Sequence, residues 1–96
     1  MANSYGEILT ARGGSYILND TSLYTGRVYA IAVLQDTIFD TLYNVDTNNV
    51  EANVLSAQIA APLVAVKAGA LLTPLDINKP FYKIKLTSGS VTLVLK

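Results

Sequence analysis

Asp36 and Asp40 are the acidic side chains whose spacing, inside a predicted strand region, could suit paired acid–base chemistry. Residues four positions apart in a strand share one face but lie roughly 13 Å apart, at a rise of about 3.3 Å per residue. The carboxylates of a glycosidase lie closer together, at most about 9.5 Å apart. We therefore predict no catalytic pair here and expect Asp36 to accept backbone N–H bonds in the turn before the next strand.

A second oxygen-rich segment, Asp46–Glu51, superficially resembles a calcium-binding loop. It lacks the spaced acidic and amide ligands, the central glycine and the distant bidentate glutamate of an EF-hand loop. We therefore predict a solvated turn and no metal site. The tripeptide Asn19-Asp20-Thr21 matches the N-glycosylation pattern, but such a short match is expected by chance in a polar loop.

Nucleophilic catalysis has little support in the composition, because the chain contains no histidine and no cysteine. A serine or threonine nucleophile would need a lysine or a carboxylate as its base, and no Ser-x-x-Lys spacing is present. Gly13-Gly14 is followed neither by a helical pattern nor by Gly-Lys-Ser/Thr, so it does not predict a phosphate-binding loop. We expect a protein that is not an enzyme and that uses no cofactor.

The tyrosines are the best material for recognition, because each combines a large apolar ring with a polar hydroxyl. They are Tyr5, Tyr16, Tyr24, Tyr29, Tyr43 and Tyr82. In a sugar-binding protein such rings would stack on pyranose faces, usually beside tryptophan and acidic partners, and this chain has no tryptophan. Core packing or a subunit interface is therefore the favoured interpretation.

The surface of this protein is expected to be poorly charged, since charged residues make up 15% of the chain against roughly 25% in an average protein. On a small domain this suggests that a partner, or further copies of the chain, cover part of the surface. Seven basic and seven acidic residues cancel, so we expect no nucleic-acid partner. No apolar run reaches the roughly 18 residues that span a bilayer, and Met1–Glu7 lacks a secretory signal pattern, so we expect no membrane partner.

The elements that position these residues are predicted to be short strands, with turn signals about every 8 to 12 residues. The predicted strands cover residues 5–10, 14–18, 27–35, 38–43, 63–66, 80–86 and 91–96. Residues 27–35 are apolar on both faces, as expected for a strand with a core on one side and a neighbouring subunit on the other. Residues 50–61 are predicted to be extended or irregular, with a short helix capped by Asn49 as the alternative.

The last two runs, Pro80–Leu86 and Val91–Lys96, flank the turn Thr87-Ser88-Gly89-Ser90, which predicts a C-terminal hairpin. The pattern as a whole predicts an all-β fold in a single domain over residues 1–96. We expect a small antiparallel β-sandwich or a jelly-roll-like barrel, with residues 1–4 as a flexible N-terminal arm.

Three segments together resemble small virion proteins of tailed bacteriophages. They are Gly26–Phe39 (GRVYAIAVLQDTIF), Lys67–Leu72 (KAGALL) and Ile84–Val91 (IKLTSGSV). In that family a strand of the form Gly-x-aromatic-Ala-Ile, an Asp-Thr-hydrophobic-Phe segment, an Ala-Gly turn and a C-terminal Ser-Gly-Ser-Val hairpin recur in this order. The chain departs from the family pattern at Pro74 and Pro80, and by ending in Lys96.

The resemblance implies a head decoration, head-fibre or similar minor capsid component without catalytic residues. We therefore expect a non-enzymatic structural subunit that is assembled in the host cytoplasm, forms homo-oligomers such as trimers, and binds the major capsid protein on the virion surface. The residues expected at the oligomer or shell interface are Tyr5, Tyr16, Tyr24, Tyr29, Ile31, Val33 and Tyr43. The alternatives are a carbohydrate-binding or adhesive β-sandwich module, and a pilus or surface-layer subunit that polymerises by strand donation.

Overall fold

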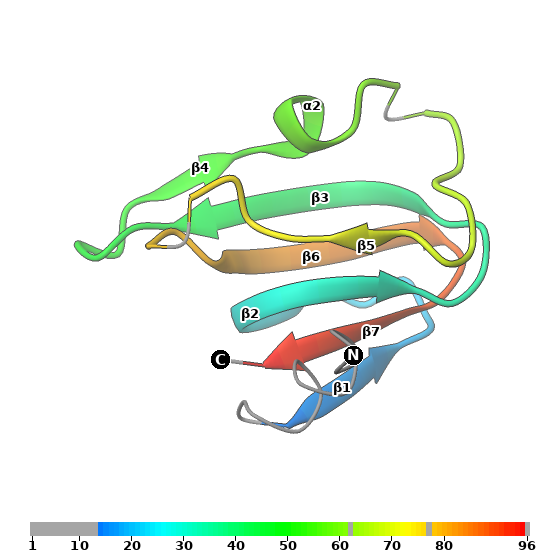
Figure 1. Cartoon of the computed structure of the whole chain (residues 1–96), viewed down its shortest axis with the longest axis horizontal. Helices are drawn as coiled ribbons and strands as arrows, with labels where there is room; N and C mark the ends of the chain where they lie inside the picture. Colours follow the sequence, from blue (N-terminus) through cyan, green and yellow to red (C-terminus); the bar gives the residue numbers. More distant parts are fainter. Residues whose placement is uncertain (1–13, 62, 77, 96) are drawn as a thin grey trace, which may run out of the picture.

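The computed structural model describes residues 14–61, 63–76 and 78–95, and their strands form one antiparallel sheet (Figure 1). The elements are β1 Ser15–Leu18, β2 Tyr24–Val33, β3 Ile38–Val45, β4 Glu51–Asn53, α2 Leu55–Gln58, β5 Leu71–Leu72, β6 Phe81–Ser88 and β7 Val91–Leu95. Their order in the sheet is β1-β7-β2-β6-β3-β4, and β5 pairs with β2 off this path. The prediction of an all-β antiparallel fold is confirmed. The predicted strand 5–10 and the predicted arm 1–4 lie outside the described residues.

The hydrophobic core is supplied by the inward faces of the central strands, with contributions from β1 and from the segment after α2. Ile84 on β6 lies opposite Tyr24 on β2 and opposite Leu42 on β3, so each inward row continues across neighbouring strands. Burying one such aliphatic side chain contributes about 1.5–3 kcal/mol. The buried members of this core are Leu18, Val28, Ile31, Val33, Phe39, Leu42, Ile59, Phe81, Ile84, Leu86, Val91 and Leu93.

The two C-terminal strands are confirmed, but they do not form the predicted hairpin with each other. β2 lies between them, since Val28 pairs with Phe81 of β6 on one side and with Leu95 of β7 on the other. Gly89, with φ of +98°, therefore turns the chain across the end of β2, where the Leu34 N–H donates to the Ser90 carbonyl at 3.0 Å. Alternation identifies strands and their faces but not their neighbours, which is why the sequence suggested a hairpin.

A bulge in β2 explains which of its side chains reach the core. Val28 and Ala30 lie opposite the consecutive residues Leu95 and Val94 of β7, so Tyr29 is an extra residue in the ladder. An extra residue reverses the alternation of the faces that follow it. Val28 and Ile31 consequently share the core side, and the predicted alternation, which placed them on opposite faces, is wrong.

Residues 50–61 contain both an extended segment and a short helix, but the predicted cap at Asn49 is wrong, because Val54 is the residue at the N-cap. An extended segment, β4, comes first, and the single helical turn α2 begins at Leu55, where the Asn53 side-chain oxygen accepts the Leu55 N–H at 3.0 Å. The predicted strand 63–66 is wrong, because within it Val66 alone pairs, through an isolated bridge to Thr37. In the part of the chain that the structure describes, no helix is long and apolar enough to cross a membrane.

Candidate assembly surface

Among the described strands, β1 forms one edge of the sheet and carries exposed apolar side chains. Its register with β7 runs without a shift from Ser15 opposite Val94 to Leu18 opposite Val91. Leu18 is buried, whereas Tyr16 is 49% exposed and Ile17 is 57% exposed. The apolar composition of this strand is typical of a covered sheet, yet two of its side chains remain accessible in the single chain.

Tyr16 forms an aromatic pair with Tyr24, the first residue of β2. The ring centroids lie 5.0 Å apart and the planes are tilted by 34°, within the range of favourable aromatic contacts. Tyr24 also packs against the hydrophobic core. Two causes raise the pKa of its hydroxyl: the larger is desolvation by burial, and the smaller is the electrostatic effect of the neighbouring Tyr16. Tyr24 therefore anchors the pair, while Tyr16 lies on its accessible side.

The other residues predicted at an interface do not join this pair. Ile31 and Val33 are 0% and 2% exposed and belong to the core of the same chain, because the β2 bulge turns them inward. Tyr29 and Tyr43 are partly buried on different strands, β2 and β3. Tyr5 lies outside the described residues. Within that predicted set, the structure brings together Tyr16 and Tyr24.

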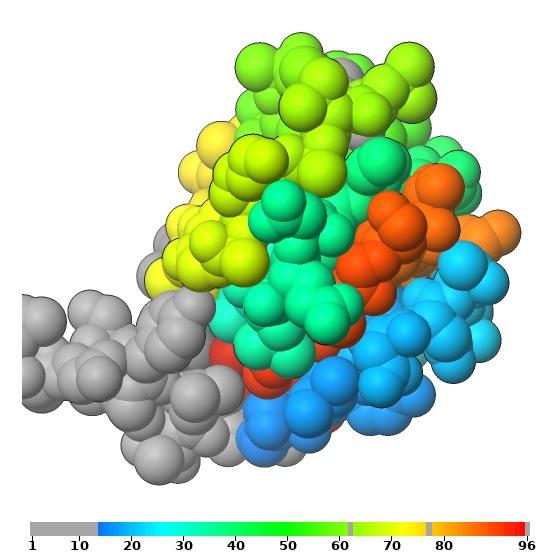
Figure 2. Space-filling model, turned by 90° about the vertical axis from the view of Figure 1, so that its right-hand side faces the viewer, coloured from blue at the N-terminus to red at the C-terminus, as the bar shows by residue number. Residues whose placement is uncertain are grey.

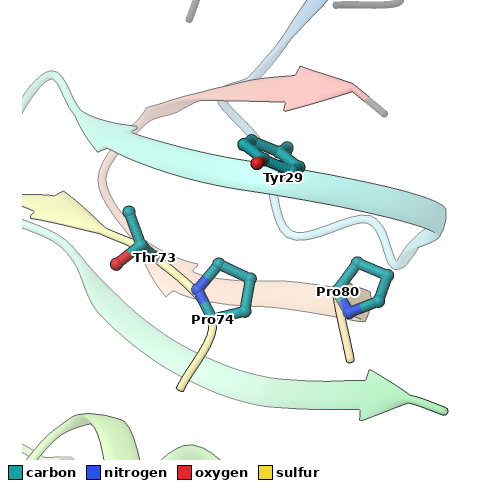
Figure 3. A pocket seen from close by; sticks show the side chains of 4 residues that line it. All are labelled: Tyr29, Thr73, Pro74 and Pro80. Carbon is teal, nitrogen blue, oxygen red and sulfur yellow. The ribbon is translucent and has the colours of Figure 1, made fainter. Parts of the chain in front are cut away.

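Tyr29 lines a pocket of about 230 Å³ at the point where β2 changes its partner (Figure 3). The first half of β2 pairs with β6 as far as Val28, and the second half pairs with β5 from Ile31 onward. The segment that joins β5 to β6 contributes the other lining residues, Thr73, Pro74 and Pro80. This pocket is smaller than the roughly 300–1,000 Å³ of most ligand sites, so it suits at most a single ring.

A second set of exposed apolar residues belongs to segments that meet at the end of the molecule that Figure 2 displays. The β2–β3 turn, the segment after α2 and the β6–β7 turn meet there, since the Val33 N–H donates to the Ala70 carbonyl and the Thr37 N–H to the Val66 carbonyl. Leu63, at 89%, is the most exposed large apolar residue among those described. The exposed apolar residues of these segments are Leu34, Leu63, Val64 and Leu71.

Sequence reasoning missed most of these exposed apolar residues because it relied on strand alternation and on tyrosine. Several of them adjoin turn residues, as Leu23 follows the polar segment 19–22 and Leu75 follows Pro74. An apolar residue in a turn need not face the core. The position of these residues between turn signals was therefore the feature of the sequence from which their exposure could have been predicted.

The Asp36 carboxylate has a structural role that connects two turns. Its Oδ1 accepts the N–H of Ala68 at 2.9 Å, and its Oδ2 lies 3.4 Å from the Lys67 ammonium. The Ala68 bond, with help from Lys67, holds the pKa of Asp36 below its usual range. The prediction that Asp36 accepts a backbone N–H is confirmed, although the donor belongs to a turn 32 residues away.

The Asp40 carboxylate accepts a hydrogen bond from the neighbouring Thr41 hydroxyl at 3.0 Å.

The Asp46 carboxylate closes its own loop. Its Oδ1 accepts the N–H groups of Asn48 and Val50 at 2.8 and 2.9 Å, and the bond from Val50 is the largest cause that lowers its pKa. Asn49 adopts a positive φ of 63° in this turn, and its side chain accepts a bond from Arg27 at 2.9 Å. Among the described residues no group of three or more acidic side chains is placed to hold a metal ion.

Comparison with known proteins gives no relative for this chain: no family model, no curated protein and no solved structure matches it.

Proposed function

We propose that this protein is a non-enzymatic structural subunit that self-associates and binds a viral shell, as a capsid decoration or stabilising component. The observation that carries the proposal is the number of large apolar side chains exposed on a small, weakly charged domain. Scattered apolar residues are normal on a surface, but grouped ones mark interaction sites. Here Tyr16 and Ile17 follow each other on β1, and Leu34, Leu63 and Val64 belong to segments that backbone hydrogen bonds hold together at one end of the molecule.

The resemblance of segments 26–39, 67–72 and 84–91 to tailed-phage virion proteins supports the choice of a shell as the larger partner. A decoration protein needs no catalytic residue, since repetition of the same weak contact over a lattice multiplies its effect. Threefold positions on such a lattice favour a trimer, and this oligomeric state is part of the proposal.

Sedimentation velocity and light scattering at micromolar concentrations test the self-association. The expected result is a species heavier than the 10.3 kDa chain, which dissociates on dilution. Co-sedimentation with assembled tailed-phage shells that lack their own minor head proteins tests the proposed binding to a viral shell. The expected result is saturable binding. A strictly monomeric protein that binds no shell would overturn the proposal.

A carbohydrate-binding module is the second candidate, favoured by the accessible Tyr16 ring beside Tyr24. Aromatic rings at a surface can stack on the apolar face of a pyranose. A glycan array compares the wild type with Tyr16→Ala, which removes the exposed ring and leaves the core-packed Tyr24 in place. Binding to a defined glycan that falls at least tenfold in the variant would support this candidate, and an array without signal would exclude it.

A further inference from the structure

We infer that β1 is the self-association site, and that two copies join their β1 strands antiparallel across a twofold axis through Tyr16. The inference rests on the proposed self-association and names the surface responsible for it. Because two copies occupy each other's β1 edge, this site gives a dimer in solution, and the trimer proposed for threefold positions of a shell would form through a different surface. Three observations on the described residues support it: the backbone groups of β1 that point away from β7, the lack of charge on β1 and β7, and the contrast with the β4 end of the sheet.

The backbone groups that β1 offers follow from its bonding to β7. The Leu95 N–H donates to the Gly14 carbonyl at 2.9 Å, so this pair is a hydrogen-bonded one. Hydrogen-bonded and non-hydrogen-bonded pairs alternate along an antiparallel ladder. Tyr16 and Leu18 therefore direct their backbone groups toward β7, whereas Ser15 and Ile17 direct theirs to the outside.

This arrangement is complementary to itself. Antiparallel pairing centred on Tyr16 places Ser15 opposite Ile17 of the second copy, so each such pair can exchange both of its backbone hydrogen bonds. Tyr16 then faces its own equivalent in a non-hydrogen-bonded pair, with Cα atoms about 4.5 Å apart and side chains in close contact. Both half-exposed side chains, Tyr16 and Ile17, become covered by the second copy.

Charge does not oppose the pairing of identical edges here. Neither β1 nor its neighbour β7, Val91–Leu95, contains a charged residue, so no like charges meet within these strands when two copies approach. β1 also contains no proline and its register shows no bulge. Charged residues, prolines and bulges are the devices by which monomeric proteins keep an exposed edge from pairing with another chain.

The opposite edge of the sheet shows such protection. β4 is short and polar, and its Glu51 carboxylate lies 2.7 Å from the Lys83 ammonium on β6. An approaching strand would meet an edge of only three residues that carries the Glu51 carboxylate, and short length and charge both protect an edge from pairing. Of the two strands that end the path β1-β7-β2-β6-β3-β4, β1 is therefore the one without such protection, and β5, off this path, has only two residues.

Engineered cysteine cross-linking tests the arrangement directly, because the natural chain contains no cysteine. Tyr16→Cys would place two thiols opposite each other at a Cα separation of about 4.5 Å, within the 4.4–6.8 Å that disulfides require. After mild oxidation of the full chain, we expect mostly disulfide-linked dimer on a non-reducing gel. The matched control is Asn48→Cys, in the exposed turn after β3, which should give at least tenfold less dimer. Adding Ile17→Lys to Tyr16→Cys should reduce the cross-link at least tenfold, since it places a charge on the edge.

Hydrogen exchange of the wild type provides a second measurement that needs no substitution. The amides of Ser15 and Ile17 should exchange more slowly as the protein concentration rises, whereas those of Tyr16 and Leu18 should not change. If the wild type self-associates but Tyr16→Cys cross-links no better than Asn48→Cys, the site lies elsewhere and the inference is overturned. This outcome would also follow if residues 1–13 of the same chain occupied the edge. If the wild type is monomeric at every concentration, the proposed function fails together with the inference.

Discussion

Gly89 lies directly against Thr37, and this contact joins the β6–β7 turn to the β2–β3 turn. A Cβ atom added to Gly89 would collide with the Thr37 hydroxyl and would lie 2.6 Å from the Thr37 Cα and 2.7 Å from the Asp36 carbonyl oxygen. Gly89 also has a φ of +98°, a conformation that side-chain-bearing residues rarely adopt. Glycine is therefore required here for two independent reasons.

The substitution Gly89→Ala should strongly destabilise the fold. Positive φ costs an alanine about 1–2 kcal/mol, and a clash with fixed backbone adds about 1–3 kcal/mol. We expect the free energy of unfolding to fall by roughly 2–5 kcal/mol, measured by urea denaturation followed with circular dichroism.

Gly69→Ala is the matched control, because Gly69 has a similar φ of +92° but no atom within 4 Å of an added Cβ. The free energy of unfolding of Gly69→Ala should fall only by the cost of a positive φ in alanine, about 1–2 kcal/mol. Equal losses in the two variants would show that the close approach of Gly89 to Thr37 has no energetic effect.

The hydroxyl of Thr37 should contribute to stability through buried hydrogen bonds. Thr37 is fully buried, and its hydroxyl donates to the Gln35 carbonyl at 2.7 Å. The Ser90 carbonyl is a second, more distant acceptor for this hydroxyl at 3.3 Å. Thr37→Val keeps the shape but removes the hydroxyl that donates to the Gln35 carbonyl, so the free energy of unfolding should fall by about 1 kcal/mol. Thr41→Val, which removes a hydroxyl bonded to Asp40 at the surface, should change the stability by less than about 0.5 kcal/mol. A fully stable Thr37→Val variant would contradict this role.

The strands were largely predictable from local patterns, whereas their neighbours were not. β1, β2, β3, β6 and β7 each overlap a predicted run, because alternation and β-branched residues are local properties. The placement of β2 between β6 and β7, and the bulge at Tyr29, depend on contacts far apart in the chain. For this reason the sequence assigned Ile31 to an interface, although it lies in the core.

The candidate surface was predictable only in part. Tyr16 and Tyr24 could be selected as large amphipathic rings, and the structure pairs them. Ile17 could not be selected, since nothing in the four residues of β1 reveals that it is the edge strand. Exposure at a sheet edge is set by the order of the strands, which local sequence does not encode.

Acid should destabilise the protein partly through Asp46 and Asp36. Backbone N–H bonds hold the pKa of each carboxyl below its usual range, so each group contributes stability that is complete above the unfolded-state pKa of about 3.9. This contribution is lost as the pH falls through the lower pKa of the folded state. The urea midpoint of the wild type should therefore fall between about pH 4 and pH 2.

The double variant Asp36→Asn/Asp46→Asn isolates this contribution, since an amide oxygen can still accept the backbone bonds but carries no charge. Its urea midpoint should be lower than that of the wild type at pH 7 and should change less on acidification. Equal acid dependence in the two proteins would show that these carboxylates do not contribute to the loss of stability.

Two isoleucines, Ile17 on β1 and Ile31 on β2, should respond very differently to truncation, because the bulge in β2 turns Ile31 inward while β1 leaves Ile17 at the edge. Ile31 is 0% exposed and belongs to the core, so Ile31→Ala should lower the free energy of unfolding by about 2–5 kcal/mol. Ile17 is 57% exposed, and Ile17→Ala should change the stability of the dilute protein by less than about 0.5 kcal/mol. Urea denaturation at the lowest measurable concentration separates this effect from any loss of self-association. A large loss in Ile17→Ala, or a negligible one in Ile31→Ala, would show that the register of β2 or β1 differs from the one described.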